Sequence, residues 1–95
     1  MSSSVAWATL LIRTEGCASI KDKRSVITGL TEGLGRLKGV AISETGHRDS
    51  HKVAELTVAV VGDSPSYVEG RIKDIIGYIE ARDVTEVIVM RLEIG

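Results

Sequence analysis

The sequence predicts an α+β fold of order βαββαβ, in which a four-stranded sheet carries two helices on one face. Three observations predict it. Apolar residues alternate in strand-like segments, two other segments have apolar residues at helical spacing, and a serine precedes each of these helical segments. A chain of 95 residues is the size of one domain, so we expect a single domain over residues 1–95.

The first strand is predicted over residues 5–13, which are rich in apolar and β-favouring residues, and Gly16 ends it. Its apolar part, residues 5–12, is too short to span a bilayer, and Arg13 follows at once. We therefore interpret it as a strand and not as a signal peptide, and we expect a cytoplasmic protein.

The first helix is predicted over residues 20–38. Ser19 is a candidate N-cap, with Asp22 three positions on as a capping-box-like partner, and Gly39 closes the segment. Its apolar residues recur at helical spacing: Ile20, Ile27, Leu30, Leu34 and Leu37.

The second half of the chain predicts a hairpin, a helix and a last strand. A strand over residues 40–46 is followed by a polar hairpin loop, residues 47–52, and by a strand from Ala54 with one buried face. The second helix begins near Asp63-Ser64-Pro65, and a last strand covers residues 87–94. The apolar stripe of this helix comprises Val68, Ile72, Ile75, Ile76 and Ile79.

The βαββαβ order is that of the ferredoxin-like split βαβ arrangement. Right-handed crossovers place both helices on one sheet face, with strand three between strands one and two and strand four beside strand one. We expect Leu56, Val58, Ile88, Met90 and Leu92 to face the helices. The opposite face would carry Trp7, Leu11, Val87 and Val89, and it is apolar enough to suggest self-association, so we expect a homodimer through this sheet surface or its edge.

Three loops meet at one end of this topology, and they bring basic side chains together. Free helix amides and cations there favour an anion, such as an RNA phosphate. The alternative is pairing with Asp22, Glu44, Asp49 or Glu55, or simple solvation. Lys23 lies on the apolar stripe of the first helix and is expected to project past the end of the sheet. The candidate anion- or RNA-binding residues are Lys21, Lys23, Arg24, His47, Arg48 and Lys52.

The sequence offers little for catalysis or metal binding. The formal net charge of −1 argues against a strongly electrostatic nucleic-acid module but allows a local basic patch. His47 and His51, with Cys17 and Asp49, suit zinc by residue type, but their spacing matches no metal motif. No partnered nucleophile is apparent. We therefore expect no catalytic residue, no metal and no cofactor.

Two blocks of residues resemble a known family. Ser19-Ile-Lys-Asp-Lys-Arg and Ser43-Glu-Thr-Gly-His, followed by Asp49 and Ala54-Glu-Leu, resemble the YlxP-like family of small bacterial proteins of unassigned function. The resemblance covers nearly the whole chain and implies a ferredoxin-like fold. The genes of that family often lie among those for translation initiation and ribosome maturation, which implies a role near the small ribosomal subunit.

These observations leave three hypotheses of different classes. The first is a non-catalytic accessory protein that associates with the small ribosomal subunit or RNA through the basic end. The second is a small-molecule-binding regulatory domain, since such modules share the βαββαβ order. The third is an enzyme of the acylphosphatase type, which ranks last because the loop after Arg13 lacks the matching pattern.

Overall fold

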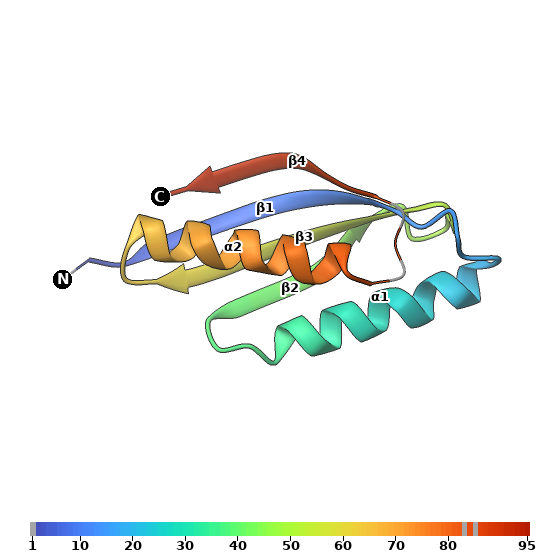
Figure 1. Cartoon of the computed structure of the whole chain (residues 1–95), viewed down its shortest axis with the longest axis horizontal. Helices are drawn as coiled ribbons and strands as arrows, with labels where there is room; N and C mark the ends of the chain where they lie inside the picture. The colour runs from blue at the N-terminus through green and yellow to red at the C-terminus, as the bar shows by residue number, and fades with distance from the viewer. Residues whose placement is uncertain (1, 83, 85) are drawn as a thin grey trace.

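The computed structural model describes residues 2–82, 84 and 86–95 and has the predicted order of elements (Figure 1). The described residues form four strands and two helices. In chain order they are β1 (Ser4–Arg13), α1 (Ile20–Gly35), β2 (Val40–Gly46), β3 (Val53–Gly62), α2 (Pro65–Glu80) and β4 (Glu86–Ile94).

The strands form one antiparallel sheet of order β2-β3-β1-β4. Strand β3 therefore lies between β1 and β2, and β4 pairs with the outer edge of β1, as the crossover rules predict. Both helices pack on the same sheet face, α1 over β2 and α2 over β1, β3 and β4 (Figure 1). The ferredoxin-like α+β fold is thus confirmed.

The core is aliphatic because the chain has no Phe. Even-numbered residues of β1 and β3 point toward the helices, and their side chains are buried against one stripe of each helix. Each fully buried Leu, Ile or Val contributes roughly 1.5–3 kcal/mol. The largest of the buried aliphatic residues are Leu10, Ile12, Leu34, Leu56, Ile72 and Ile79.

Both helices begin where the serines predict. The Ser19 hydroxyl accepts the Asp22 amide at 3.1 Å, and the Ser64 hydroxyl accepts the Tyr67 amide at 3.2 Å. Helix α1 ends at Gly35, three residues earlier than predicted, and the chain then turns through Gly39. Gly39 has φ of 77°, and a Cβ there would lie 3.0 Å from the Val61 carbonyl, so the turn requires glycine.

The first half of β4 faces the opposite way from the prediction. Val87 lies opposite Ile12, and Val89 lies opposite Leu10, and both of these β1 residues are buried on the helix side. Directly opposite residues share a sheet face. Val87 and Val89 therefore belong to the helix side and not to the open face, and Ile88 belongs to the open face.

A register shift in the pairing of β1 with β4 explains this error. The shift falls between Thr9 and Leu10, where Met90 is the extra residue of β4. One extra residue reverses the alternation. Beyond it, Leu92 lies opposite Ala8 on the helix side, as predicted.

Candidate functional site

The loops between β1 and α1, β2 and β3, and α2 and β4 gather at one end of the molecule, away from both chain termini (Figure 1). The β2–β3 loop and the first turns of α1 supply exposed cationic side chains. We call this surface the basic end and define it by Lys21, Arg24, His47, Arg48 and Lys52, all of which are exposed.

Lys23 is not part of that exposed surface. Its side chain is 1 % exposed, and its ammonium group donates to the His47 and Ser50 carbonyls, both at 2.6 Å. The Glu44 carboxylate lies 3.5 Å away. The expectation that Lys23 projects past the end of the sheet is wrong, because its stem folds beneath the β2–β3 loop and its donors are engaged there.

Thr14 secures the other half of the same loop. Its side chain is fully buried, its hydroxyl donates to the His51 carbonyl at 2.8 Å, and its amide donates to the Lys52 carbonyl at 2.7 Å. Together with Lys23, it satisfies carbonyls at four of the six loop positions 47–52. The backbone of the loop is thus fixed from the inside, and basic side chains remain on the outside.

The turn of the loop adds three local constraints. The Ser50 amide donates to the His47 carbonyl at 3.2 Å, and His47 has φ of 58°, in the left-handed region that non-glycine residues seldom occupy. Arg48 donates to the Glu44 carbonyl at 2.6 Å. These contacts shape the loop so that His47, Arg48 and Lys52 lie on its exposed side.

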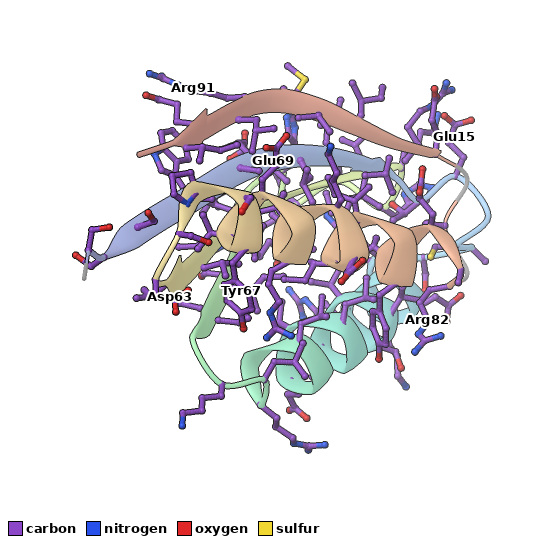
Figure 2. The ribbon with its side chains drawn as sticks, turned by 60° about the vertical axis from the view of Figure 1, so that its left-hand side comes forward. Glu15, Asp63, Tyr67, Glu69, Arg82 and Arg91 are labelled. Carbon is purple, nitrogen blue, oxygen red and sulfur yellow. The ribbon has the colours of Figure 1, made fainter. Side chains whose placement is uncertain are left out.

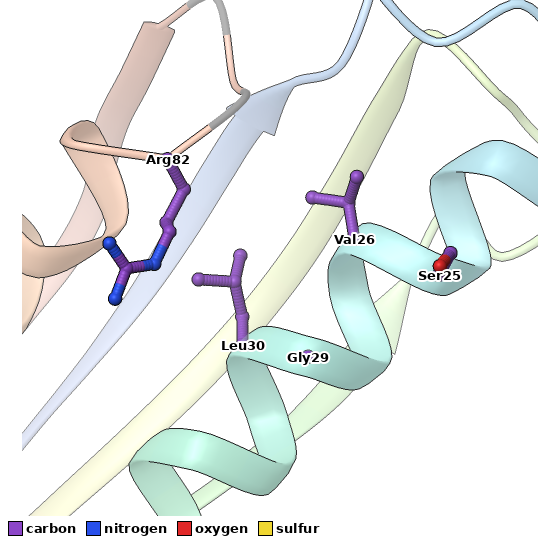
Figure 3. A pocket seen from close by; sticks show the side chains of 5 residues that line it. All are labelled: Ser25, Val26, Gly29, Leu30 and Arg82. Atoms are coloured by element: carbon purple, nitrogen blue, oxygen red, sulfur yellow. The ribbon is translucent and has the colours of Figure 1, made fainter.

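Two further cations near this end are engaged elsewhere. Arg13 pairs with Glu15 and, at 3.2 Å, with Glu86, and hydrogen bonds to Glu15 and then Glu86 raise the pKa of Arg13. Arg82, at the end of α2, lies over the Tyr78 ring at 3.9 Å. Figure 3 shows it directed toward α1, where it lines a cavity of about 220 Å³ with Ser25, Val26, Gly29 and Leu30.

Acidic groups are interspersed with the basic ones. Asp22 and Asp49 are exposed beside Lys21 and Arg48, and Glu44 pairs with Lys23. The prediction of internal pairing is thus confirmed for Lys23 and Glu44. The roles of Lys21, Arg24, His47, Arg48 and Lys52 in anion binding stay predictions.

Neither a metal cluster nor a membrane-spanning helix occurs among the described residues. Within that part of the chain, no three His, Cys, Asp or Glu side chains are grouped so that they could hold a metal ion. The Cys17 thiol is free and half-buried. Neither described helix combines the length and apolarity needed to cross a membrane.

The open sheet face is more polar than the sequence suggests. Trp7 and Leu11 are half-buried on it, and Arg91 lies 5.1 Å from the centre of the Trp7 ring. A row of hydroxyls crosses the sheet from Thr9 to Thr57 at 3.2 Å and on to Thr45 at 2.9 Å. Because Val87 and Val89 lie on the helix side, the open sheet face carries both apolar and polar side chains.

Thr14 is the residue that sequence reasoning missed. A signal for it exists, because the inward-facing alternation of Ala6, Ala8, Leu10 and Ile12 continues to position 14. A polar residue in phase with a buried row must find a partner inside the fold. Here the partner is the loop carbonyl.

The fold and this end define a ferredoxin-like α+β domain with basic groups on one loop-rich end. The chain belongs to the family described as protein of unknown function (DUF503), whose model matches residues 5–92. Comparison with curated proteins finds no match.

Among solved structures, the chain is similar to one described as "De novo designed protein Foldit4". The two share 15 % identity with a TM-score of 0.53, and the match covers 99 % of this chain and 97 % of that one. This likeness shows the fold alone.

Proposed function

We propose that the protein is a non-catalytic accessory protein of the cytoplasm that binds RNA, in the small ribosomal subunit, through the basic end. The observation that best supports this proposal is that hydrogen bonds from Lys23 and Thr14 fix the backbone of the β2–β3 loop. Because these hydrogen bonds hold the loop beside the start of α1, the cations of the loop and those of the first turns of α1 lie at the same end of the molecule.

The chemistry of this surface suits a phosphate backbone. Lys21 and Arg24 stand near the N-terminus of α1, where cations are unfavourable to the helix by roughly 0.3–1 kcal/mol each. A polyanion would relieve that cost and would accept hydrogen bonds from Arg24 and Arg48. Contacts of this kind position an RNA backbone without reading its bases. The resemblance to the YlxP-like family supports the choice of the small subunit.

The test is a titration of labelled small-subunit RNA, or of intact small subunits, at several salt concentrations. The wild type is compared with Lys21→Ala/Arg24→Ala and with a control, Arg36→Ala/Lys73→Ala, which removes the same charge from exposed positions outside the basic end. We expect weaker binding only for the first variant. Failure of the wild type to bind at low salt, or equal weakening by both variants, contradicts the proposal.

The second candidate function is binding of a small regulatory molecule. The cavity beside Arg82 favours it, because a guanidinium and apolar walls could take a small carboxylate (Figure 3). Its volume of about 220 Å³ is below the ~300–1,000 Å³ of most ligand sites, which ranks this function second. A thermal-shift screen with small carboxylic acids tests it, and no stabilisation by any of them would remove it.

The third hypothesis, an acylphosphatase-type enzyme, gains no support from the position of Arg13. Such chemistry requires an arginine available to a phosphate group at the first loop. The Arg13 guanidinium instead pairs with Glu15 and Glu86.

A further inference from the structure

We propose that β4 is the interface of a homodimer, in which its free edge pairs antiparallel with β4 of a second copy and extends the sheet across the two molecules. This inference concerns a surface outside the basic end and is independent of the proposed function.

The first observation is an unpaired strand edge. In the described part of the chain, β4 pairs with β1 on one side and has no strand on the other, and Figure 2 shows it at the rim of the molecule. A free edge presents a row of amides and carbonyls ready to pair with another strand. Proteins usually protect such edges with proline, short length, charged side chains or a β-bulge. Strand β4 has nine residues and no proline, and its Arg91 and Glu93 pair with each other, so its main protection is the extra residue at Met90.

The second observation is the apolar surface of β4. Val89, Met90, Leu92 and Ile94 are 45 %, 60 %, 40 % and 36 % exposed. The other free edge, β2, is shorter and presents Ala41, Ser43 and Thr45, and none of its residues is an exposed large hydrophobic. The two edges of one sheet therefore differ, and only β4 has the composition of an interface core.

The third observation makes β4 complementary to itself. Because the extra residue at Met90 reverses the alternation, Val87 and Val89 before it and Leu92 and Ile94 after it share the helix side. A two-fold axis between Met90 and Arg91 sets Val89 opposite the partner's Leu92 and Val87 opposite the partner's Ile94. Both pairs in this register are apolar and lie on the helix side, so a second copy is the occupant that fits.

The size of the contact suits a weak, concentration-dependent dimer. Nine residues at about 3.3 Å each give an edge about 30 Å long. The helix-side residues Val89, Leu92 and Ile94 stay 36–45 % exposed, so the sheet layer, about 10 Å thick, sets the depth of the contact. The contact is then about 300 Å² per copy, or about 600 Å² in total, which is in the range of weak, transient interfaces.

The first arm of the test measures the mass of the full chain by sedimentation equilibrium over a range of concentrations. We expect a dimer for the wild type and a weakening of self-association by about tenfold or more for Val89→Lys. Ser43→Lys, which places the same charge on the β2 edge, should leave the dimer intact. A wild type that stays monomeric, or a dimer equally sensitive or insensitive to both variants, overturns the proposal.

The second arm fixes the register and does not depend on the lysine variant folding. In a Cys17→Ser background, Val89→Cys and Leu92→Cys proteins are prepared separately, mixed and oxidised. We expect a cross-linked dimer from the mixture and little from either protein alone, since each residue lies opposite the other type across the axis. Cross-linking in the mixture no stronger than with Ser43→Cys in place of Val89→Cys overturns the proposal.

Discussion

At the residue scale, the most unusual feature of the fold is a lysine, Lys23, buried among apolar side chains. Lys23 shares the buried face of α1 with Ile27, Leu30 and Leu34. A charge removed from water is tolerated only when it is well paired and hydrogen-bonded. Here two loop carbonyls and Glu44 satisfy it, so the lysine connects the helix to the loop that it covers.

The sequence correctly placed Lys23 on the apolar stripe of α1, but it did not predict where the ammonium group of the side chain would lie. A lysine has a flexible four-carbon stem, so its charged head can reach solvent or a nearby acceptor from the same Cα position. The choice depends on where the β2–β3 loop places its carbonyls. That placement is a tertiary property which no spacing along the helix reports.

We predict that Lys23→Met lowers the free energy of unfolding by about 2–4 kcal/mol while keeping the length of the side chain. The variant leaves the Ser50 carbonyl without its Lys23 donor, takes one of two donors from the His47 carbonyl and removes the charged partner of Glu44. Urea denaturation measures the change. Lys21→Met is the matched control, since Lys21 is exposed, and should change stability by no more than about 0.5 kcal/mol. Equal losses in the two variants would show that the buried contacts contribute nothing.

The burial of Lys23 changes which variants can test RNA binding. Replacing Lys23 would remove its buried hydrogen bonds to the β2–β3 loop, so such a variant would not separate a lost charge from a changed loop. The exposed pair Lys21 and Arg24 is the appropriate substitution, because neither side chain is buried.

At the element scale, periodicity predicted every strand and helix, and local irregularities decided the rest. Alternation in β1 and β3 identified the buried rows correctly because these central strands pair with each other without a register shift. In β4, the extra residue at Met90 turned Val87 and Val89 to the other face. A bulge depends on the pairing with β1, so the sequence of β4 alone could not show it.

The ends of the helices follow the same pattern. Serine caps are local signals, and both were predicted because one side chain and one amide suffice to make them. The end of α1 was placed three residues too far, since the stripe continues to Leu37. In the structure, the Leu37 amide bonds to the Leu34 carbonyl, which tightens the chain into the turn before Gly39.

We predict that Ser19→Ala lowers the free energy of unfolding by about 1 kcal/mol, because the Asp22 amide loses its acceptor at the first turn of α1. Thermal and urea denaturation measure it. Ser25→Ala, at an exposed position inside the same helix, should be neutral or slightly stabilising, since alanine is the better helix former. A loss as large at Ser25 as at Ser19 would argue against the cap.

At the scale of the whole molecule, the protein is elongated, with extents of 48 × 23 × 21 Å. The basic end lies at one extremity, and the β4 edge runs along one side (Figure 1). A dimer through β4 would leave the basic end of each copy uncovered. RNA binding by the basic end and dimerisation through β4 can therefore be tested independently.

The sharpest test of RNA binding by the basic end is its salt dependence, measured for each segment separately. Lys21→Ala/Arg24→Ala removes cations near the helix start, Arg48→Ala/Lys52→Ala removes cations of the pinned loop, and Arg36→Ala/Lys73→Ala is the control. If both segments form one phosphate-binding surface, each of the first two variants should reduce the log–log salt slope by about 0.7–0.9 for every phosphate that it no longer neutralises, and their combination by the sum. The control should keep the wild-type slope. Unchanged slopes in either basic-end variant, or an equal reduction in the control, would contradict binding through this surface.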